Sequence, residues 1–109
     1  MAKHEFGIME SDPVKGRRYD DYEPQKYDCI SVDDDYIEGI QERLLIFDSF
    51  CHTVDIPMKG LNYCGITLIP PTSIDAFLTV IGVSSKYAEL RKLLFDAKNR
   101  NKYLIHYGL

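Results

Sequence analysis

The feature that most constrains this chain is residues 10–26, a stretch that cannot fold as a buried helix or a central strand. It contains Pro13, Gly16 and Pro24 among five acidic and four basic residues, and Val14 is its one aliphatic residue. Irregular connections longer than about 12–15 residues are uncommon in compact domains and are usually functional loops or mobile segments. The composition therefore predicts a long surface loop at 10–26.

The composition of the whole chain is that of one globular domain over residues 1–109. Hydrophobic residues make up 45% and charged residues 28%, which is ordinary for a soluble protein. The 17 Asp and Glu outnumber the 13 Lys and Arg, giving a net charge of −4. An acidic chain with no Lys/Arg run is not expected to bind nucleic acid.

The ends and the cysteines predict a cytoplasmic protein without a membrane partner. The first six residues are already charged, unlike a signal peptide, and the apolar stretches at 66–69 and 77–83 are too short to cross a bilayer. Three cysteines without C-x-x-C spacing indicate reduced thiols rather than disulfides or a zinc site. Phosphate-binding glycine motifs are absent, so no cofactor is expected.

Hydrophobic periodicity outlines the remaining elements. Apolar patterns predict strands at 3–9, 27–32, 61–69 and 103–107, of which 3–9 alternates and 61–69 is apolar on both faces and is expected to be central. Steps of three and four predict three helices, the first running from the acids at 33–35 to Cys51, the second over 74–82 and the third from Ser84 or Ser85 to about Arg100. Gly39, inside the first helix, is expected to mark close packing by another element.

The resulting order β-β-α-β-α-α-β predicts an α+β fold. We expect a two-layer domain, in which three helices pack on one face of a four-stranded mixed or antiparallel sheet. Such a sheet has two edges and a second face to cover, so a homodimer is a possible assembly.

The candidate binding residues lie in the predicted loop. Two guanidinium groups stand beside two aromatic rings and a carboxylate, at Arg17, Arg18, Tyr19, Asp20 and Tyr22. Arginine and tyrosine are favoured in binding hot spots, and an arginine pair can hold a carboxylate or phosphate. The sequence thus favours a non-catalytic module that binds a protein partner or a small anionic ligand. The alternative interpretation is a solvated loop whose charges neutralise one another.

A second hypothesis is a small enzyme that uses Cys64 with His4 and His106. The two histidines lie on the first and last predicted strands, and Cys64 lies on a central one, so strand pairing would bring them together. Such a cluster would activate a thiolate or hold a metal. The alternative interpretation is a structural one, in which two half-buried histidines form hydrogen bonds with backbone carbonyls. The acids Asp33–Asp35 lack the spacing of a calcium loop, so no metal site is assigned to them.

Four short stretches resemble a family of small uncharacterised bacterial proteins. They are HEFGIM at 4–9, RYD at 18–20, VDDD at 32–35 and GITLIPP at 65–71. The resemblance covers most of the chain and implies a bacterial cytoplasmic origin. It implies no activity, fold or catalytic residue.

Overall fold

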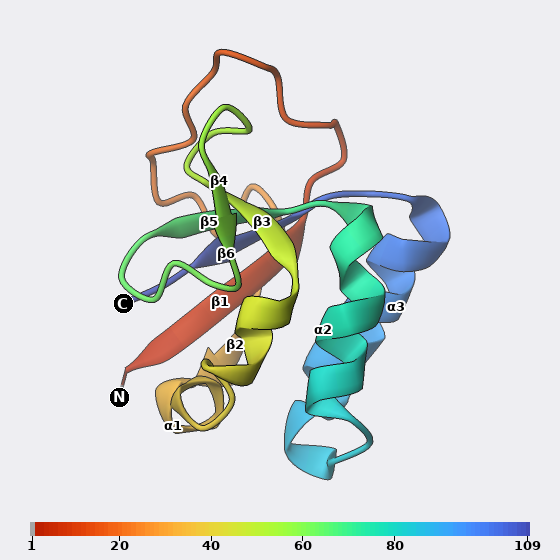
Figure 1. Ribbon diagram of the computed structural model, residues 1–109. Coiled ribbons are helices and arrows are strands. Elements are labelled where there is room, and N and C mark those ends of the chain that lie inside the picture. Colours follow the sequence, from red (N-terminus) through yellow and green to blue (C-terminus); the bar gives the residue numbers. More distant parts are fainter. Residues whose placement is uncertain (1) are drawn as a thin grey trace.

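A computed structural model describes residues 2–109 and has an α+β architecture (Figure 1). Its strands and helices, with three short 3-10 turns labelled η, are β1 (Lys3–Ile8), β2 (Ile30–Asp33), α1 (Asp34–Glu38), η1 (Arg43–Ile46), β3 (Asp48–Cys51), β4 (Pro57–Lys59), β5 (Ile66–Ile69), η2 (Pro71–Ser73), α2 (Ile74–Ile81), η3 (Ser85–Tyr87), α3 (Ala88–Arg100) and β6 (Leu104–Tyr107). The six strands form one sheet in the order β2-β1-β6-β5-β3-β4, and every neighbouring pair is antiparallel. The predicted α+β class is confirmed, whereas the prediction of four strands was wrong.

The two additional strands come from residues that the sequence assigned to the first helix and to the loop after it. The α1 helix ends at Glu38, and Phe50 pairs with Leu68 of β5 on one side and with Pro57 of β4 on the other. Ladder hydrogen bonds in the sheet therefore override a local helical pattern. Pro57 is compatible with β4 because β4 is an edge strand.

The predicted apolar stripe nevertheless marks the residues that are buried. Ile37, Ile40, Leu44 and Phe47 are each at most 3% exposed, although they lie on a broken path of helix and turn. The interpretation of Gly39 was wrong, because a Cβ there would meet only carbonyl oxygens of the same turns, the nearest at 3.5 Å. Glycine instead coincides with the end of the helix, in line with its low helix propensity.

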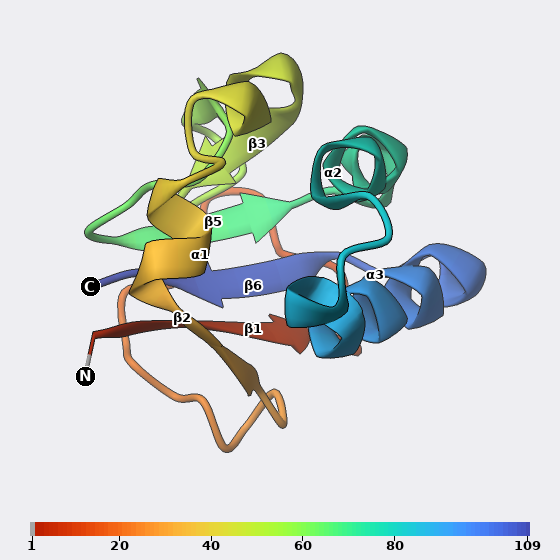
Figure 2. The same ribbon diagram turned by 90° about the horizontal axis from the view of Figure 1, so that it is seen from below.

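One face of the sheet is covered by helices. Figure 2 shows α1 and α2 on the same side of the sheet. Phe6 of β1 and Leu104 of β6 point into this layer and are completely buried, as are Phe77 of α2 and Leu94 of α3. Phe77 packs edge-on against Phe6 at a ring-centroid distance of 5.9 Å. These residues form the larger of two hydrophobic clusters.

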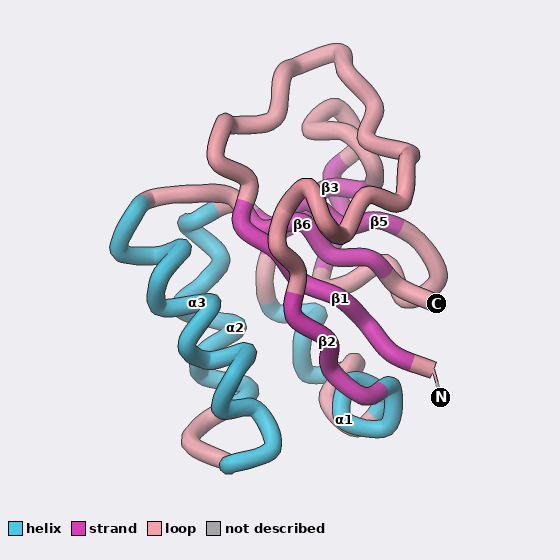
Figure 3. Tube along the Cα trace, turned by 180° about the vertical axis from the view of Figure 1, so that it is seen from behind, coloured by secondary structure: helices cyan, strands magenta, loops and turns pink. Residues whose placement is uncertain are grey.

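The opposite face of the sheet is covered by the chain between β1 and β2. The apolar side chains on this face of the sheet come from Met9 and from β5 and β6, and include Leu68 and Ile105. Tyr19, Tyr27 and other partly buried side chains pack on this second cluster. The face that suggested a homodimer is thus packed by the protein's own irregular segment, which Figure 3 shows running out beyond the sheet and back to β2.

Among residues 2–109, no helix combines the length and the apolar character needed to span a lipid bilayer.

Candidate functional site

Residues 10–26, hereafter the 10–26 segment, contain no helix or strand. Backbone hydrogen bonds still attach the segment to the domain at defined points. The Tyr19 N–H donates to the His52 carbonyl at 2.7 Å, and the Gly16 N–H donates to Asp55 Oδ2 at 2.7 Å. The Tyr19 hydroxyl accepts the Val14 N–H at 2.9 Å. The middle of the segment is therefore positioned by the β3–β4 connection.

Arg18 and Asp20 form part of this attachment. Arg18 donates Nε and Nη2 to the two carboxylate oxygens of Asp20, at 2.9 and 3.1 Å. Asp20 Oδ1 also lies 2.8 Å from Nδ1 of His52, at ion-pair distance but without an aligned hydrogen bond. The hydrogen bond from Arg18, more than the contact with His52, holds the pKa of the Asp20 carboxyl below its usual range. Both groups are thus already paired within the protein.

Tyr22 attaches the end of the segment to β1. Its hydroxyl donates to the carboxylate of Glu5, and its ring packs edge-on against Tyr107 at 5.2 Å between centroids. The hydrogen bond to Glu5 is the main cause that raises the pKa of Tyr22. Two predicted binding residues, Asp20 and Tyr22, therefore make contacts that hold the segment in place, and Arg18 is paired with Asp20.

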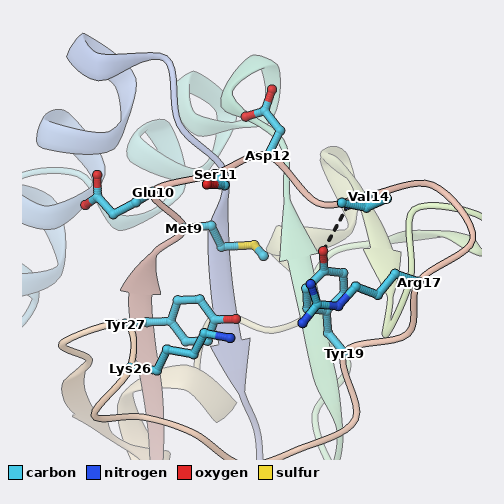
Figure 4. Close-up of a pocket in the computed structure, with 9 residues that line it drawn as sticks. All are labelled: Met9, Glu10, Ser11, Asp12, Val14, Arg17, Tyr19, Lys26 and Tyr27. Carbon is cyan, nitrogen blue, oxygen red and sulfur yellow. Dashed lines mark hydrogen bonds between the residues drawn. The ribbon is translucent and has the colours of Figure 1, made fainter.

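Arg17 differs from these residues because it has no ion-pair partner among residues 2–109 and lines a pocket on the other side of Tyr19. The pocket has a volume of about 260 Å³, with Arg17 and Tyr19 on one side, Lys26 and Tyr27 on the other, and Met9 between them (Figure 4). The Arg17 guanidinium carbon lies 4.9 Å from the centre of the Tyr19 ring, and Lys26 Nζ lies 5.5 Å from the centre of the Tyr27 ring. Each cation thus lies against an aromatic ring and faces the same space.

Acidic side chains at the pocket rim do not neutralise these two cations. Glu10 forms an ion pair with Arg100 of α3, and Figure 4 shows the Glu10 and Asp12 carboxylates pointing away from the space between the tyrosines. Among residues 2–109, no carboxylate lies within ion-pair distance of Arg17 or Lys26. The two cations therefore face the pocket from its walls, while the two acids lie at its rim.

Sequence reasoning identified Arg17 and Tyr19 but not the opposite wall. Lys26 and Tyr27 are distant from Arg17 along the chain, and only the closure of the loop across the sheet brings the walls together. The available signal was the repeated pairing of a cation with a tyrosine, at 17–19 and at 26–27.

The structure also brings His4 and His106 together, in a buried hydrogen-bonded row on the helix-covered face. His4 Nε2 lies 3.0 Å from Asp34 Oδ1, His4 Nδ1 lies 2.8 Å from His106 Nε2, and His106 Nδ1 lies 3.0 Å from Thr67 Oγ1. The Tyr63 hydroxyl donates to the same Asp34 oxygen. Asp34 and Thr67 were not predicted, because neither lies near the histidines in sequence.

One proton on each ring satisfies every nitrogen of this row. The Asp34 carboxylate only accepts, so His4 donates from Nε2 and accepts at Nδ1 from His106 Nε2–H. His106 then accepts the Thr67 O–H at Nδ1. Burial, followed by the nearby His4, lowers the pKa of His106 well below its usual value, in keeping with this neutral arrangement.

The row has the groups of a nucleophilic relay but no access for a substrate. A hydroxyl, imidazoles and a carboxylate in sequence are the components of such a relay. Thr67, His4 and His106 are each 0% exposed, and they lie under the helices. The row is therefore a means of satisfying buried polar groups in the core.

Cys64 does not take part in this row. Its side chain is exposed, whereas both histidine rings are fully buried. It lines a separate open cavity of about 330 Å³ together with Asp20 and His52. The predicted combination of Cys64, His4 and His106 is thus divided between the core and the surface.

The other two thiols are enclosed to different degrees. Cys51 Sγ accepts a hydrogen bond from Asn62 Nδ2 at 3.3 Å. Burial raises the pKa of the Cys29 thiol to about 12, so this thiol is protonated and poorly reactive at neutral pH.

The acidic residues of α1 form the one group of three potential metal ligands found among residues 2–109. Ligand atoms of Asp34, Asp35 and Glu38 lie within 4.8 Å of one another. Asp34 is already engaged by Tyr63 and His4, and the pKa of its carboxyl is lowered by those hydrogen bonds, the one from Tyr63 most strongly. Asp34 and Asp35 lie in the first turn of α1, where the helix dipole favours acidic side chains.

No protein-family model, curated protein or solved structure matches the chain.

Proposed function

We propose that this protein is a non-catalytic binding module whose contact surface is the 10–26 segment. Its partner is a small anionic ligand or a protein, and a second copy of the chain is one such protein. We further propose a cytoplasmic location, because the three cysteines are free thiols and suit a reducing compartment.

One observation carries this proposal: Arg17 and Lys26 face one pocket without a carboxylate partner among the described residues. Charged side chains that have no internal partner are available for an external one. Arginine next to an aromatic ring is a composition typical of binding hot spots.

The attachment of the segment supports the same proposal. Tyr19, Asp20 and Tyr22 fix the segment to β1 and to the β3–β4 connection. A loop that is already positioned loses less conformational freedom on binding, so more of the contact energy appears as affinity. In this proposal, Arg17 contacts the partner, and Arg18, Tyr19, Asp20 and Tyr22 hold the surface that presents it.

The test is a map of binding on the ¹⁵N-labelled protein. Amide signals are recorded with a set of small organic compounds divided equally among anions, neutral molecules and cations, and in a separate series of rising protein concentration. We expect the signals that move in a saturable way to belong to residues 9–29. Self-association through this surface would move the same signals in the concentration series.

The double variant R17Q/K26Q should weaken these effects, while K15Q serves as its matched control. Lys15 is an exposed cation of the same segment that does not line the pocket. Signals that cluster instead around His52 and Cys64, or the absence of any saturable change in residues 9–29, would contradict the proposed function.

A further inference from the structure

We infer that the pocket between Arg17 and Lys26 binds a small organic anion, a carboxylate or phosphate group joined to a compact apolar body. This inference rests on the proposed function and specifies the ligand class of the same site.

The anionic group is specified by the two cations. They approach the pocket from opposite walls, each lying against a tyrosine ring. Two donors on opposite sides suit a group with several acceptor oxygens, and arginine in particular matches the geometry of carboxylate and phosphate. A cationic or neutral ligand would leave both charges unpaired.

The apolar body is specified by what lies between the cations. Met9 is 3% exposed and belongs to the hydrophobic cluster on this face of the sheet, on which Tyr19 and Tyr27 also pack. Met9 is thus nearly closed off at the base of the pocket, and the partly exposed rings of Tyr19 and Tyr27 are the apolar surfaces that can contact a planar group. An inorganic anion alone would make no use of these rings.

The size of the ligand is limited by the pocket. A volume of about 260 Å³ lies just below the range of pockets that hold drug-sized molecules, which begins at about 300 Å³. The pocket therefore suits a compact anion and not a nucleotide or a long peptide.

Two other features of the structure give weaker evidence for a ligand site. The cavity with Cys64 and His52 offers a lone exposed thiol, and His52 Nε2 accepts the Ile66 N–H at 3.4 Å, which occupies the nitrogen that a base would use. The acidic cluster on α1 offers a carboxylate that is already engaged by two side chains.

The experiment compares matched probes by titration of the ¹⁵N-labelled protein. Benzoate, benzamide and benzamidine share one ring and differ in charge, acetate tests benzoate without its ring, and phenyl phosphate exchanges the carboxylate for a phosphate. We expect saturable binding of benzoate or phenyl phosphate, with affinity at least about fivefold higher than that of benzamide or acetate. The better of the two anions identifies the preferred acidic group.

The variants R17Q and K26Q should each weaken anion binding by about threefold to tenfold, and K15Q should leave it within a factor of about two. These side chains are exposed, so unchanged amide signals outside residues 9–29 will report an intact fold.

The outcomes distinguish a failure of the anion pocket from a failure of the proposed binding surface. If benzamide binds in residues 9–29 as tightly as benzoate, or if K15Q weakens benzoate as much as R17Q, the anion pocket is overturned and the binding surface stands. If none of the five probes moves these signals, the anion pocket is overturned. If the wider compound set and the concentration series also fail, the proposed function falls as well.

Discussion

The two faces of the sheet are covered in different ways. Helices α2 and α3 cover one face with regularly spaced apolar side chains, and the polar row from Asp34 to Thr67 crosses that face with its hydrogen bonds satisfied. On the other face, single tyrosines of an irregular segment perform the same task. An irregular cover buries its rings and leaves neighbouring cations such as Arg17 and Lys26 facing outward. Regular packing thus encloses the side chains of one face, and irregular packing leaves charged side chains exposed on the other.

The largest expected effect is that of removing a ring from the core of the helix-covered face. Phe77→Ala deletes a fully buried side chain that stacks on Phe47 at 5.2 Å, and should lower the free energy of unfolding by about 3–5 kcal/mol. Phe95→Ala, on the neighbouring helix, is the control because Phe95 is 46% exposed, and its effect should be within about 1 kcal/mol. Urea unfolding measures both. Equal losses would contradict the assignment of the main core to this face.

Gly7→Ala tests how tightly the irregular segment packs on the other face of the sheet. A Cβ at residue 7 would lie 2.7 Å from the Tyr27 carbonyl oxygen and 2.8 Å from Cys29 Sγ, so the end of the irregular cover would have to shift. We expect a loss of about 1–3 kcal/mol, which is the usual range for overpacking.

Gly39→Ala is the control for Gly7→Ala, because residue 39 has helical dihedral angles and no close neighbour. It should leave stability unchanged or raise it by about 0.4–1 kcal/mol. If Gly7→Ala also leaves thermal unfolding unchanged, the cover is not packed tightly on β1.

The polar row gives the helix-covered face a pH dependence. The pKa of His106 is lowered in the folded protein, so below pH about 6.5 the unfolded chain takes up a proton that the folded protein does not. Stability should therefore be complete above this pH and fall as the pH decreases, with a slope of at most about 1.4 kcal/mol per pH unit from this residue.

Urea unfolding between pH 7 and 5 checks this slope in the wild type and in H106Q. The variant should lose the slope whatever its absolute stability, and H52Q should retain it because His106 is still present. A slope that persists unchanged in H106Q would show that another group causes it. The Asp34 carboxyl, whose pKa is lowered, acts below pH about 3.8 and lies outside this window.

Sequence periodicity predicted which residues are buried better than it predicted the elements that carry them. Ile37, Leu44 and Phe47 were assigned to one long helix and are all buried, yet the helix ends at Glu38. The pairing of Phe50 with Leu68 decides the local structure, and a contact between strands so distant in sequence leaves no periodic signal.

The candidate site likewise depends on contacts between residues that the sequence pattern does not bring together. The composition of residues 10–26 indicated a loop and identified Arg17, but only the closure of that loop places Lys26 opposite it. His4 and His106 approach each other because β1 pairs with β6. The sequence predicted that the two rings would meet only if these strands paired, and it did not determine the strand order. Cys64 is excluded from that pair by its exposure, and exposure is a tertiary property.

The position of the 10–26 segment between β1 and β2 has an evolutionary consequence. The two strands are direct antiparallel neighbours, so the segment is an enlarged hairpin connection whose ends are fixed by the same four residue pairs. Lengthening such a connection is thermodynamically cheap, at about 0.6 kcal/mol for each doubling. Insertions and exchanges between the anchoring tyrosines can therefore change the surface that this segment presents without altering the register of the sheet.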